Sequence, residues 1–261
     1  DTPSDDLSGL TLADFVLGAC PQRLSSIASL GTCPPTDAPR ITQSKNKGLS
    51  ETLPAGLQSP PKKTLDHLTS LSDLATALDQ LHTCPLKNTA SSMCFADGNA
   101  GARLMIIGET PGRDEDRLGM PFVGASGQFL DSMMASIGLD RSGVYLINFL
   151  PWRPPGNRTP TTEEIDMLLP FLHRHVQLAN PEMILILGGA PAKVILNTND
   201  NILKLRGRWQ GVDYGDGVLR PTMASLHPHY LMRSPAQKRL AFNDWLCLYQ
   251  QLSTTALPIM V

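Results

Sequence analysis

Three polar side chains that could do chemistry each stand at the end of an apolar run: Glu109, Asn148 and His227. A carboxylate can stabilise a cation or orient a water molecule, and an amide can distinguish hydrogen-bond donors from acceptors. An imidazole can donate a hydrogen bond to an oxygen that becomes negative during a reaction. Taken singly each signal is weak, because turn carboxylates, strand-end amides and loop histidines usually serve structure or face solvent. Their chemistry therefore depends on whether the fold brings the three together.

The elements that must position these residues are predicted from apolar runs that alternate with helical patterns. Short apolar runs predict four buried strands, at residues 104–107, 144–149, 183–187 and 222–225. Apolar residues spaced three or four positions apart predict helices around them. This alternation predicts an α/β fold with a central four-stranded parallel sheet flanked by helices. Ligands of such sheets bind at the carboxyl ends of the strands, where the three polar side chains all fall.

Three helix starts carry capping signals. Ser70 with Asp73, and Thr161 with Glu164, have the spacing of a capping box. The third signal, at residues 234–237, reads Ser-Pro-Ala-Gln and predicts a capping box that opens a long C-terminal helix.

Composition limits the class of protein. The chain has 261 residues, of which 41% are hydrophobic, and its net charge is −2. This balance excludes a strongly basic, histone-like protein but allows a local basic face. No run approaches the roughly 18 apolar residues of a membrane span, and the acidic first residues lack the layout of a secretory signal. We therefore expect a soluble, cytoplasmic protein without membrane contact.

The chain divides into three parts by composition. Residues 1–63 are rich in Pro, Ser and Thr and predict a largely irregular N-terminal extension or linker. Residues 64–253 predict the globular domain, and residues 254–261 a C-terminal tail. The five cysteines are widely spread without a C-x-x-C pair, which argues against a disulfide scaffold and an intact metal cluster.

Several motifs follow one another in a specific order. Residues 108–116 read GETPGRDED, and residues 119–127 follow with Gly-x-Pro-Phe-Val-Gly-x-x-Gly. Asn148 precedes an Arg-Pro-Pro-Gly-Asn-Arg-Thr-Pro segment at 153–160, and residues 227–233 read His-Pro-x-x-Leu-x-Arg. Over residues 70–250 this series resembles the family 4 uracil-DNA glycosylases.

The resemblance implies a pocket for a uracil swung out of DNA. Phe122 would stack on the base, and Asn148 would donate to uracil O4 while accepting from N3–H. Gly108 and Thr110 would line the same pocket. His227 would donate a hydrogen bond to O2 of the leaving uracil anion.

The resemblance also implies groups that act on the sugar. Glu109 or Glu115 would stabilise the positively charged sugar or orient the attacking water, and the sequence does not decide between them. No lysine in the motifs suggests a Schiff-base nucleophile, so we expect a monofunctional glycosylase that leaves an abasic site.

Contacts with DNA are expected from cations near the motifs and from one apolar side chain. The expected cations are Arg153, Arg158, Arg233, Lys238 and Arg239. Leu231 is expected to wedge into the duplex where the base leaves.

The sequence departs from the family at the positions of its iron–sulfur cysteines. The family is expected to hold a 4Fe–4S cluster through four cysteines, of which only Cys84 remains. Leu81, Trp152 and Leu168 stand at the other three positions. One thiolate cannot hold a cluster that ordinarily needs four, so we expect no cofactor and an apolar plug at these positions.

Two classes of function remain. The first is hydrolytic removal of uracil from DNA in base excision repair, and the alternative is binding of uracil-containing DNA without turnover. The retention of Glu109, Phe122, Asn148 and His227 favours the enzyme. We expect a monomer associated with the nucleoid, and residues 1–63 permit an interaction with a repair or replication partner.

Overall fold

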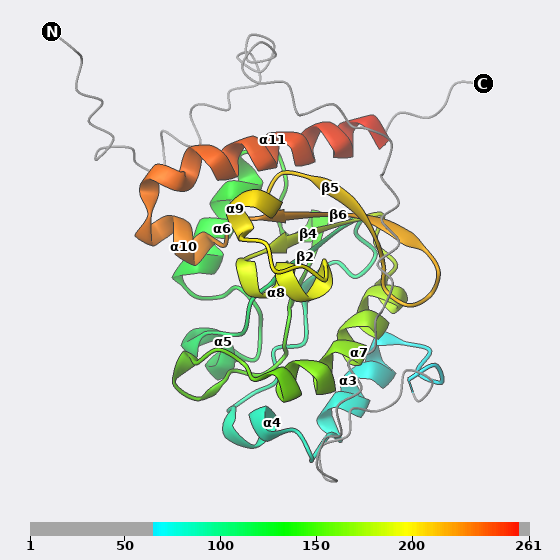
Figure 1. Cartoon of the computed structure of the whole chain (residues 1–261). Coiled ribbons are helices and arrows are strands. Elements are labelled where there is room, and N and C mark those ends of the chain that lie inside the picture. The colour runs from blue at the N-terminus through cyan, green and yellow to red at the C-terminus, as the bar shows by residue number, and fades with distance from the viewer. Residues whose placement is uncertain (1–64, 256–261) are drawn as a thin grey trace, which may run out of the picture.

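The computed structural model describes residues 65–255, so the predicted extension at 1–63 and residues 256–261 lie outside the described part. Within this part a six-stranded sheet is sandwiched between helices (Figure 1). The strands lie in the order β1-β3-β2-β4-β6-β5. Their bounds are β1 Asp97–Gly98, β2 Leu104–Gly108, β3 Val144–Asn148, β4 Met183–Leu187, β5 Trp209–Asp213 and β6 Leu219–Ser225.

The four inner strands are those predicted from the apolar runs. They pair in parallel, with β2 between β3 and β4 and with β6 beyond β4. Every position of β2, β3 and β4 is buried. Strands covered on both faces read as continuous apolar runs, which is why the sequence reveals them. The prediction of a four-stranded parallel core is confirmed.

The two edge strands are an addition to the prediction. β1 pairs antiparallel with β3, and β5 pairs antiparallel with β6. β1 has two residues, one of them a glycine at φ +83°, and β5 is largely half-buried. Neither has the apolar run or the clear alternation that marks a strand in the sequence.

The helices form two layers because alternate strand residues point to opposite faces of the sheet. On one face, Met105 and Ile107 of β2 join a core with four helices: α3 Leu71–Asp79, α4 Pro85–Thr89, α7 Thr162–Ala179 and α8 Gly189–Ile195. On the other face, Leu104 and Ile106 join a core with three helices: α6 Ala125–Ala135, α10 Pro228–Arg233 and α11 Lys238–Thr255. Shorter segments complete the described part: α5 Arg113–Leu118, α9 Ile202–Leu205, η3 Arg141–Gly143, η4 Pro155–Asn157 and η5 Pro235–Gln237.

Two of the three predicted helix starts are confirmed. Ser70 and Thr161 both form complete capping boxes, at the starts of α3 and α7. The capping box predicted at Ser234 is wrong, because this side chain makes no capping hydrogen bond and a 3₁₀ turn separates it from α11. None of the described helices is long and apolar enough to cross a membrane.

Candidate active site

The carboxyl ends of the inner strands meet at one edge of the sheet. Gly108 at the end of β2 lies opposite Asn148 at the end of β3. The N–H of Gly188, just after β4, donates to the carbonyl of Ser225 at the end of β6 over 3.0 Å. His227 follows two residues later and caps α10. The fold therefore gathers the strand ends that carry the predicted chemistry.

The side chains of Phe122 and Asn148 both pack against Gly108. A Cβ at this position would lie 2.3 Å from Cζ of Phe122 and 3.1 Å from Oδ1 of Asn148. The ring and the amide thus touch the same small patch of backbone. Only a residue without a side chain allows this approach.

The Asn148 side chain is buried, and its amide nitrogen has no hydrogen-bond partner among the described residues. The residue is 8% exposed. An unsatisfied buried donor costs about 1–3 kcal/mol, and a ligand that accepts a hydrogen bond beside Phe122 could satisfy this one.

Phe122 has an unusual backbone conformation. Its φ is +55°, in the left-handed region, which costs a large L-residue about 1–3 kcal/mol. Gly127 packs directly on the Phe122 backbone, where a Cβ would lie 1.8 Å from the Phe122 carbonyl oxygen. Arg141 donates to that same oxygen over 2.5 Å. These contacts fix the Phe122 backbone, from which the ring projects.

His227 packs near Phe122 and presents a neutral ring. The two ring centroids are 6.1 Å apart and the planes differ by 22°. The Nδ1 atom accepts the backbone N–H of His229 over 3.1 Å, which leaves the proton on Nε2. Burial, with the nearby charge of His229, lowers the pKa of His227 to about 4. At neutral pH this imidazole is therefore an uncharged donor.

Glu109 is half-buried and rests against the turn after β4. A Cβ on Gly188, whose φ is +115°, would lie 2.4 Å from Oε1 of Glu109. Burial raises the pKa of the Glu109 carboxyl, and a hydrogen bond from the N–H of Gly189 partly offsets this effect. The Gly188-Gly189 pair thus holds this carboxylate. Thr110 follows Glu109 and is also half-buried.

Glu115 serves a different purpose. Its Oε1 accepts the N–H of Gly124 over 2.9 Å, and its Oε2 accepts the N–H of Gly112 over 3.1 Å. The residue is buried. One oxygen therefore caps the start of α5 and the other ties α5 to the end of the loop that carries Phe122. Glu109 is the carboxylate with one backbone partner.

Comparison with known proteins agrees with this geometry. A family model described as the uracil DNA glycosylase superfamily matches residues 95–247, which contain every residue of the site. The chain belongs to the uracil-DNA glycosylase superfamily. The type-4 uracil-DNA glycosylase of Archaeoglobus fulgidus is 37% identical over 181 residues, covering 67% of this chain and 90% of that protein. The enzyme of the same type from Thermotoga maritima is 33% identical over 164 residues, covering 62% and 83%.

The cations expected to contact DNA fall into two groups in this glycosylase fold. Arg158 makes two hydrogen bonds to Glu164, at 2.8 and 2.5 Å, and Arg153 donates to Asn157 over 2.7 Å. Arg233 and Arg239 are exposed, and the structure gives neither an ion-pair partner within residues 65–255. Lys238 lies 5.2 Å above the ring of Phe129. The start of α11 is thus the more available basic surface.

The burial of Leu231 contradicts the expectation that its side chain wedges into the DNA duplex. Its side chain is 0% exposed and belongs to the core between the sheet and α6, α10 and α11. In this conformation it cannot reach DNA, because a wedge must project from the surface. Its neighbours Tyr230 and Met232 are exposed instead, at 41% and 45%. Spacing from His227 alone cannot distinguish the inward side of a short helix from the outward side.

The positions of the family's cluster cysteines lie in an apolar core. Cys84, Trp152 and Leu168 are buried in the core that α3 and α7 share with the sheet, and Leu81 packs against it. Burial raises the pKa of the Cys84 thiol. Within residues 65–255 no group of three or more His, Cys, Asp or Glu side chains could hold a metal ion. A single protonated thiol in apolar surroundings does not fit a 4Fe–4S cluster, which takes thiolate ligands.

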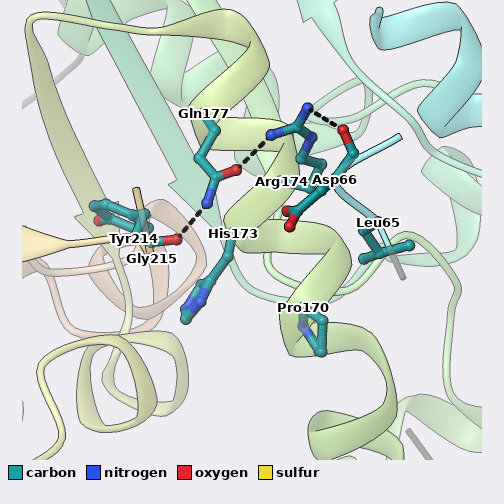
Figure 2. A pocket seen from close by; sticks show the side chains of 8 residues that line it. All are labelled: Leu65, Asp66, Pro170, His173, Arg174, Gln177, Tyr214 and Gly215. Carbon is teal, nitrogen blue, oxygen red and sulfur yellow. Dashed lines mark hydrogen bonds between the residues drawn. The ribbon is translucent and has the colours of Figure 1, made fainter. Parts of the chain in front are cut away.

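A shallow hollow elsewhere on the molecule is not part of the site. It lies between α7, Leu65 and the turn after β5, and Figure 2 shows its lining. The Gln177 amide bridges it by donating to the carbonyl of Tyr214 and accepting from Arg174, both over 2.8 Å. Arg174 also donates to the carbonyls of Asp66 and Leu68. These contacts fasten the first described residues to α7.

Proposed function

We propose that this chain hydrolyses the N-glycosidic bond of uracil in DNA and leaves an abasic site for base excision repair. The observation that carries the proposal is the unpaired, buried Nδ2 of Asn148 beside the Phe122 ring. The names of the type-4 uracil-DNA glycosylases that are 37% and 33% identical to it over the aligned residues support the same activity.

Recognition of uracil follows from the two groups that meet over Gly108. A base flipped out of the duplex stacks on Phe122, and such stacking is worth about 1–3 kcal/mol. The Asn148 amide then donates to O4 and accepts from N3–H. Cytosine presents an amino group and an acceptor at these places, so both hydrogen bonds would be reversed and the buried amide left mispaired.

Bond cleavage puts negative charge on uracil and positive charge on the sugar. The Nε2–H of the neutral His227 donates to O2 as charge develops there, and a donor so placed contributes about 3–4 kcal/mol. A neutral imidazole remains the donor down to a pH of about 4, because burial holds the His227 pKa there.

We assign to Glu109 the role of acting on the sugar or the attacking water. Its carboxylate has a single backbone partner, whereas both oxygens of Glu115 accept backbone N–H groups. Glu109 accordingly stabilises the oxocarbenium-like sugar or orients the attacking water, and Glu115 shapes the Phe122 loop.

We further propose that the chain works without an iron–sulfur cluster and as a monomer. The apolar surroundings of Cys84 support the first point. Arg233, Lys238 and Arg239 at the junction of α10 and α11 would meet the DNA backbone, which supports the proposed association with the nucleoid. Any partner of residues 1–63 lies outside the described residues.

The test is excision from a uracil-containing oligonucleotide by the purified full chain, with Asn148→Ala and His227→Ala as variants. Arg220→Lys, far from the site at the start of β6, is the matched control. We expect an abasic product from the wild type and the control, and a loss of about 10²-fold or more in each site variant. Tight binding of uracil-DNA without product would favour the non-catalytic alternative. Iron in the purified protein, together with the visible absorbance of an iron–sulfur cluster, would contradict the cluster-free proposal.

A further inference from the structure

Phe122 cannot hold its own conformation. An aromatic residue at φ +55° relaxes to a negative φ unless its surroundings prevent it. A change of φ at Phe122 would rotate the direction of its Cβ and carry the ring away from Gly108 and Asn148. The group that fixes the backbone of Phe122 therefore also fixes the place of the ring.

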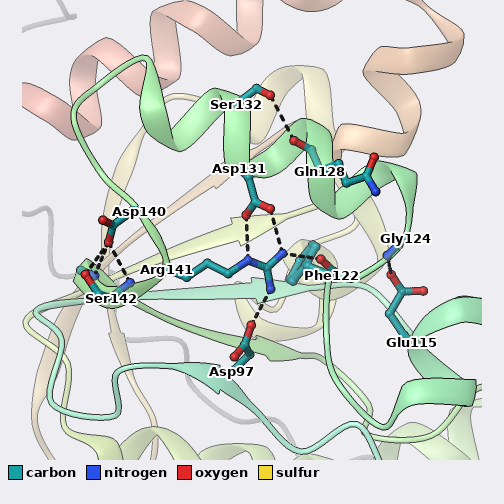
Figure 3. Close-up of polar contacts among 11 residues, drawn as sticks. Asp97, Glu115, Phe122, Gly124, Gln128, Asp131, Ser132, Asp140, Arg141 and Ser142 are labelled. Atoms are coloured by element: carbon teal, nitrogen blue, oxygen red, sulfur yellow. Dashed lines mark hydrogen bonds and ion pairs between the residues drawn. The ribbon is translucent and has the colours of Figure 1, made fainter.

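Arg141 is the side chain that reaches this backbone (Figure 3). It precedes β3 and lies 19 positions along the chain from Phe122. Its Nη2 donates to the Phe122 carbonyl over 2.5 Å and to Oδ2 of Asp131 over 3.1 Å. Its Nε donates to Oδ1 of Asp131 over 2.9 Å, and its Nη1 to Asp97 over 2.5 Å.

These partners fix the guanidinium in three directions. Asp131 comes from α6, Asp97 from the edge strand β1, and Phe122 from the loop between α5 and α6. The two carboxylates orient the planar group, and its remaining Nη2–H points to the carbonyl. A lysine ammonium could neutralise a carboxylate here, but its compact charge cannot span three divergent acceptors.

We propose that Arg141 is a positioning residue for uracil, which holds the Phe122 carbonyl and thereby keeps the Phe122 ring in its base-stacking place. This inference rests on the proposed role of Phe122 in the pocket. Asp97 and Asp131 belong to the same hydrogen-bond network, because they orient the Arg141 guanidinium.

The first test is steady-state excision of uracil by Arg141→Lys. We expect kcat to fall by about 10- to 100-fold, because a misplaced positioning group has losses of that size. KM for DNA should change by less than about twofold, since Arg141 is not among the residues proposed to meet the DNA backbone. Arg103→Lys is the matched control. Arg103 also joins a carboxylate, Glu182, and a backbone carbonyl, that of Leu252, but at the amino end of β2. It should leave kcat within about twofold of wild type.

The decisive test repeats the change in a Phe122→Ala background. Once the ring is gone, Arg141→Lys should lower kcat by less than about twofold, because coupled residues are not additive. A merely structural arginine would lower kcat by the same factor in both backgrounds, and that outcome would overturn the inference. An equal loss in the Arg103→Lys control, or no loss in Arg141→Lys, would overturn it as well.

The same experiment separates this inference from the function on which it rests. If Phe122→Ala excises uracil as fast as the wild type, the pocket itself is wrongly assigned. If Phe122→Ala is impaired and the two arginine effects multiply independently, the pocket stands and only the role of Arg141 is rejected.

Discussion

Glu109 and Glu115 are carboxylates six positions apart with opposite environments. Burial raises the pKa of Glu109, and one backbone N–H compensates in part. Glu115 accepts two backbone N–H groups, that of Gly112 at the start of α5 and that of Gly124 at the end of the Phe122 loop. Burial of an ionised Glu109 therefore lowers the stability of the fold, whereas the hydrogen bonds of Glu115 raise it.

Replacement by glutamine should separate the two roles. We expect Glu109→Gln to lower kcat by about 10²-fold or more. Its free energy of unfolding at pH 7 should stay equal or rise, because a neutral amide avoids burial of a charge. Glu115→Gln should lower the free energy of unfolding by about 1–3 kcal/mol, since its amide group would face a backbone N–H. Single-turnover excision and urea unfolding measure the two effects. The assignment would fail if Glu115→Gln lost more activity than Glu109→Gln at equal stability.

At the scale of elements, the turn after β4 positions Glu109, because Gly188 in this turn has no side chain to displace the carboxylate. Gly188 has a φ of +115° and stands where a Cβ would overlap the Glu109 carboxylate. Gly189 begins α8, has an ordinary φ, and would place a Cβ 3.7 Å from Ile202. Adjacent glycines thus have different reasons to be glycine.

Alanine at each position makes a matched pair. We expect Gly188→Ala to reduce kcat by about 10²-fold, because it displaces the carboxylate that acts on the sugar or water. It should also lower stability by about 1–3 kcal/mol through its strained backbone. Gly189→Ala keeps the N–H that donates to Glu109 and should change kcat less than about twofold, because its Cβ makes an ordinary contact. Excision kinetics and thermal unfolding of both variants test this, and equal activity of the two would count against the role given to Gly188.

The sequence predicts the features that depend on neighbouring residues and misses those that depend on contacts between distant ones. The buried runs of β2, β3 and β4 and the capping box at Thr161 are local, and they were predictable. The contact of Arg141 with Phe122 joins residues 19 positions apart, so no pattern in the sequence marks it. The short strand β1 depends on pairing with β3, and the burial of Leu231 depends on how α10 packs against α6.

At the scale of the whole molecule, the core beneath the site contains a neutral histidine. His175 of α7 accepts from, or donates to, the Tyr145 hydroxyl of β3 over 2.8 Å. Its ring stacks on Phe95 with centroids 4.5 Å apart. Burial lowers the pKa of His175 to about 4 and raises that of Tyr145 to about 12. This pair ties a helix to the central sheet without any charge.

Acid should therefore weaken the fold well before it protonates this histidine in the native state. An unfolded chain protonates His175 near its ordinary pKa of about 6.5, whereas the native chain does so only near 4. Between these values the unfolded state binds more protons, so stability falls as the pH is lowered through this window, by about 3 kcal/mol from this residue. His227, whose pKa is also lowered to about 4, acts in the same direction.

The measurement is urea unfolding at several pH values between 7 and 4, for the wild type, His175→Phe and an exposed-site control, His82→Asn. The phenylalanine variant should be less stable at pH 7, because the Tyr145 hydroxyl loses its partner. Its stability should nevertheless fall less steeply toward pH 4, since one of the two histidines with a lowered pKa no longer titrates. The control should keep the wild-type slope. If His175→Phe also kept that slope, the role given to His175 in the acid sensitivity would be wrong.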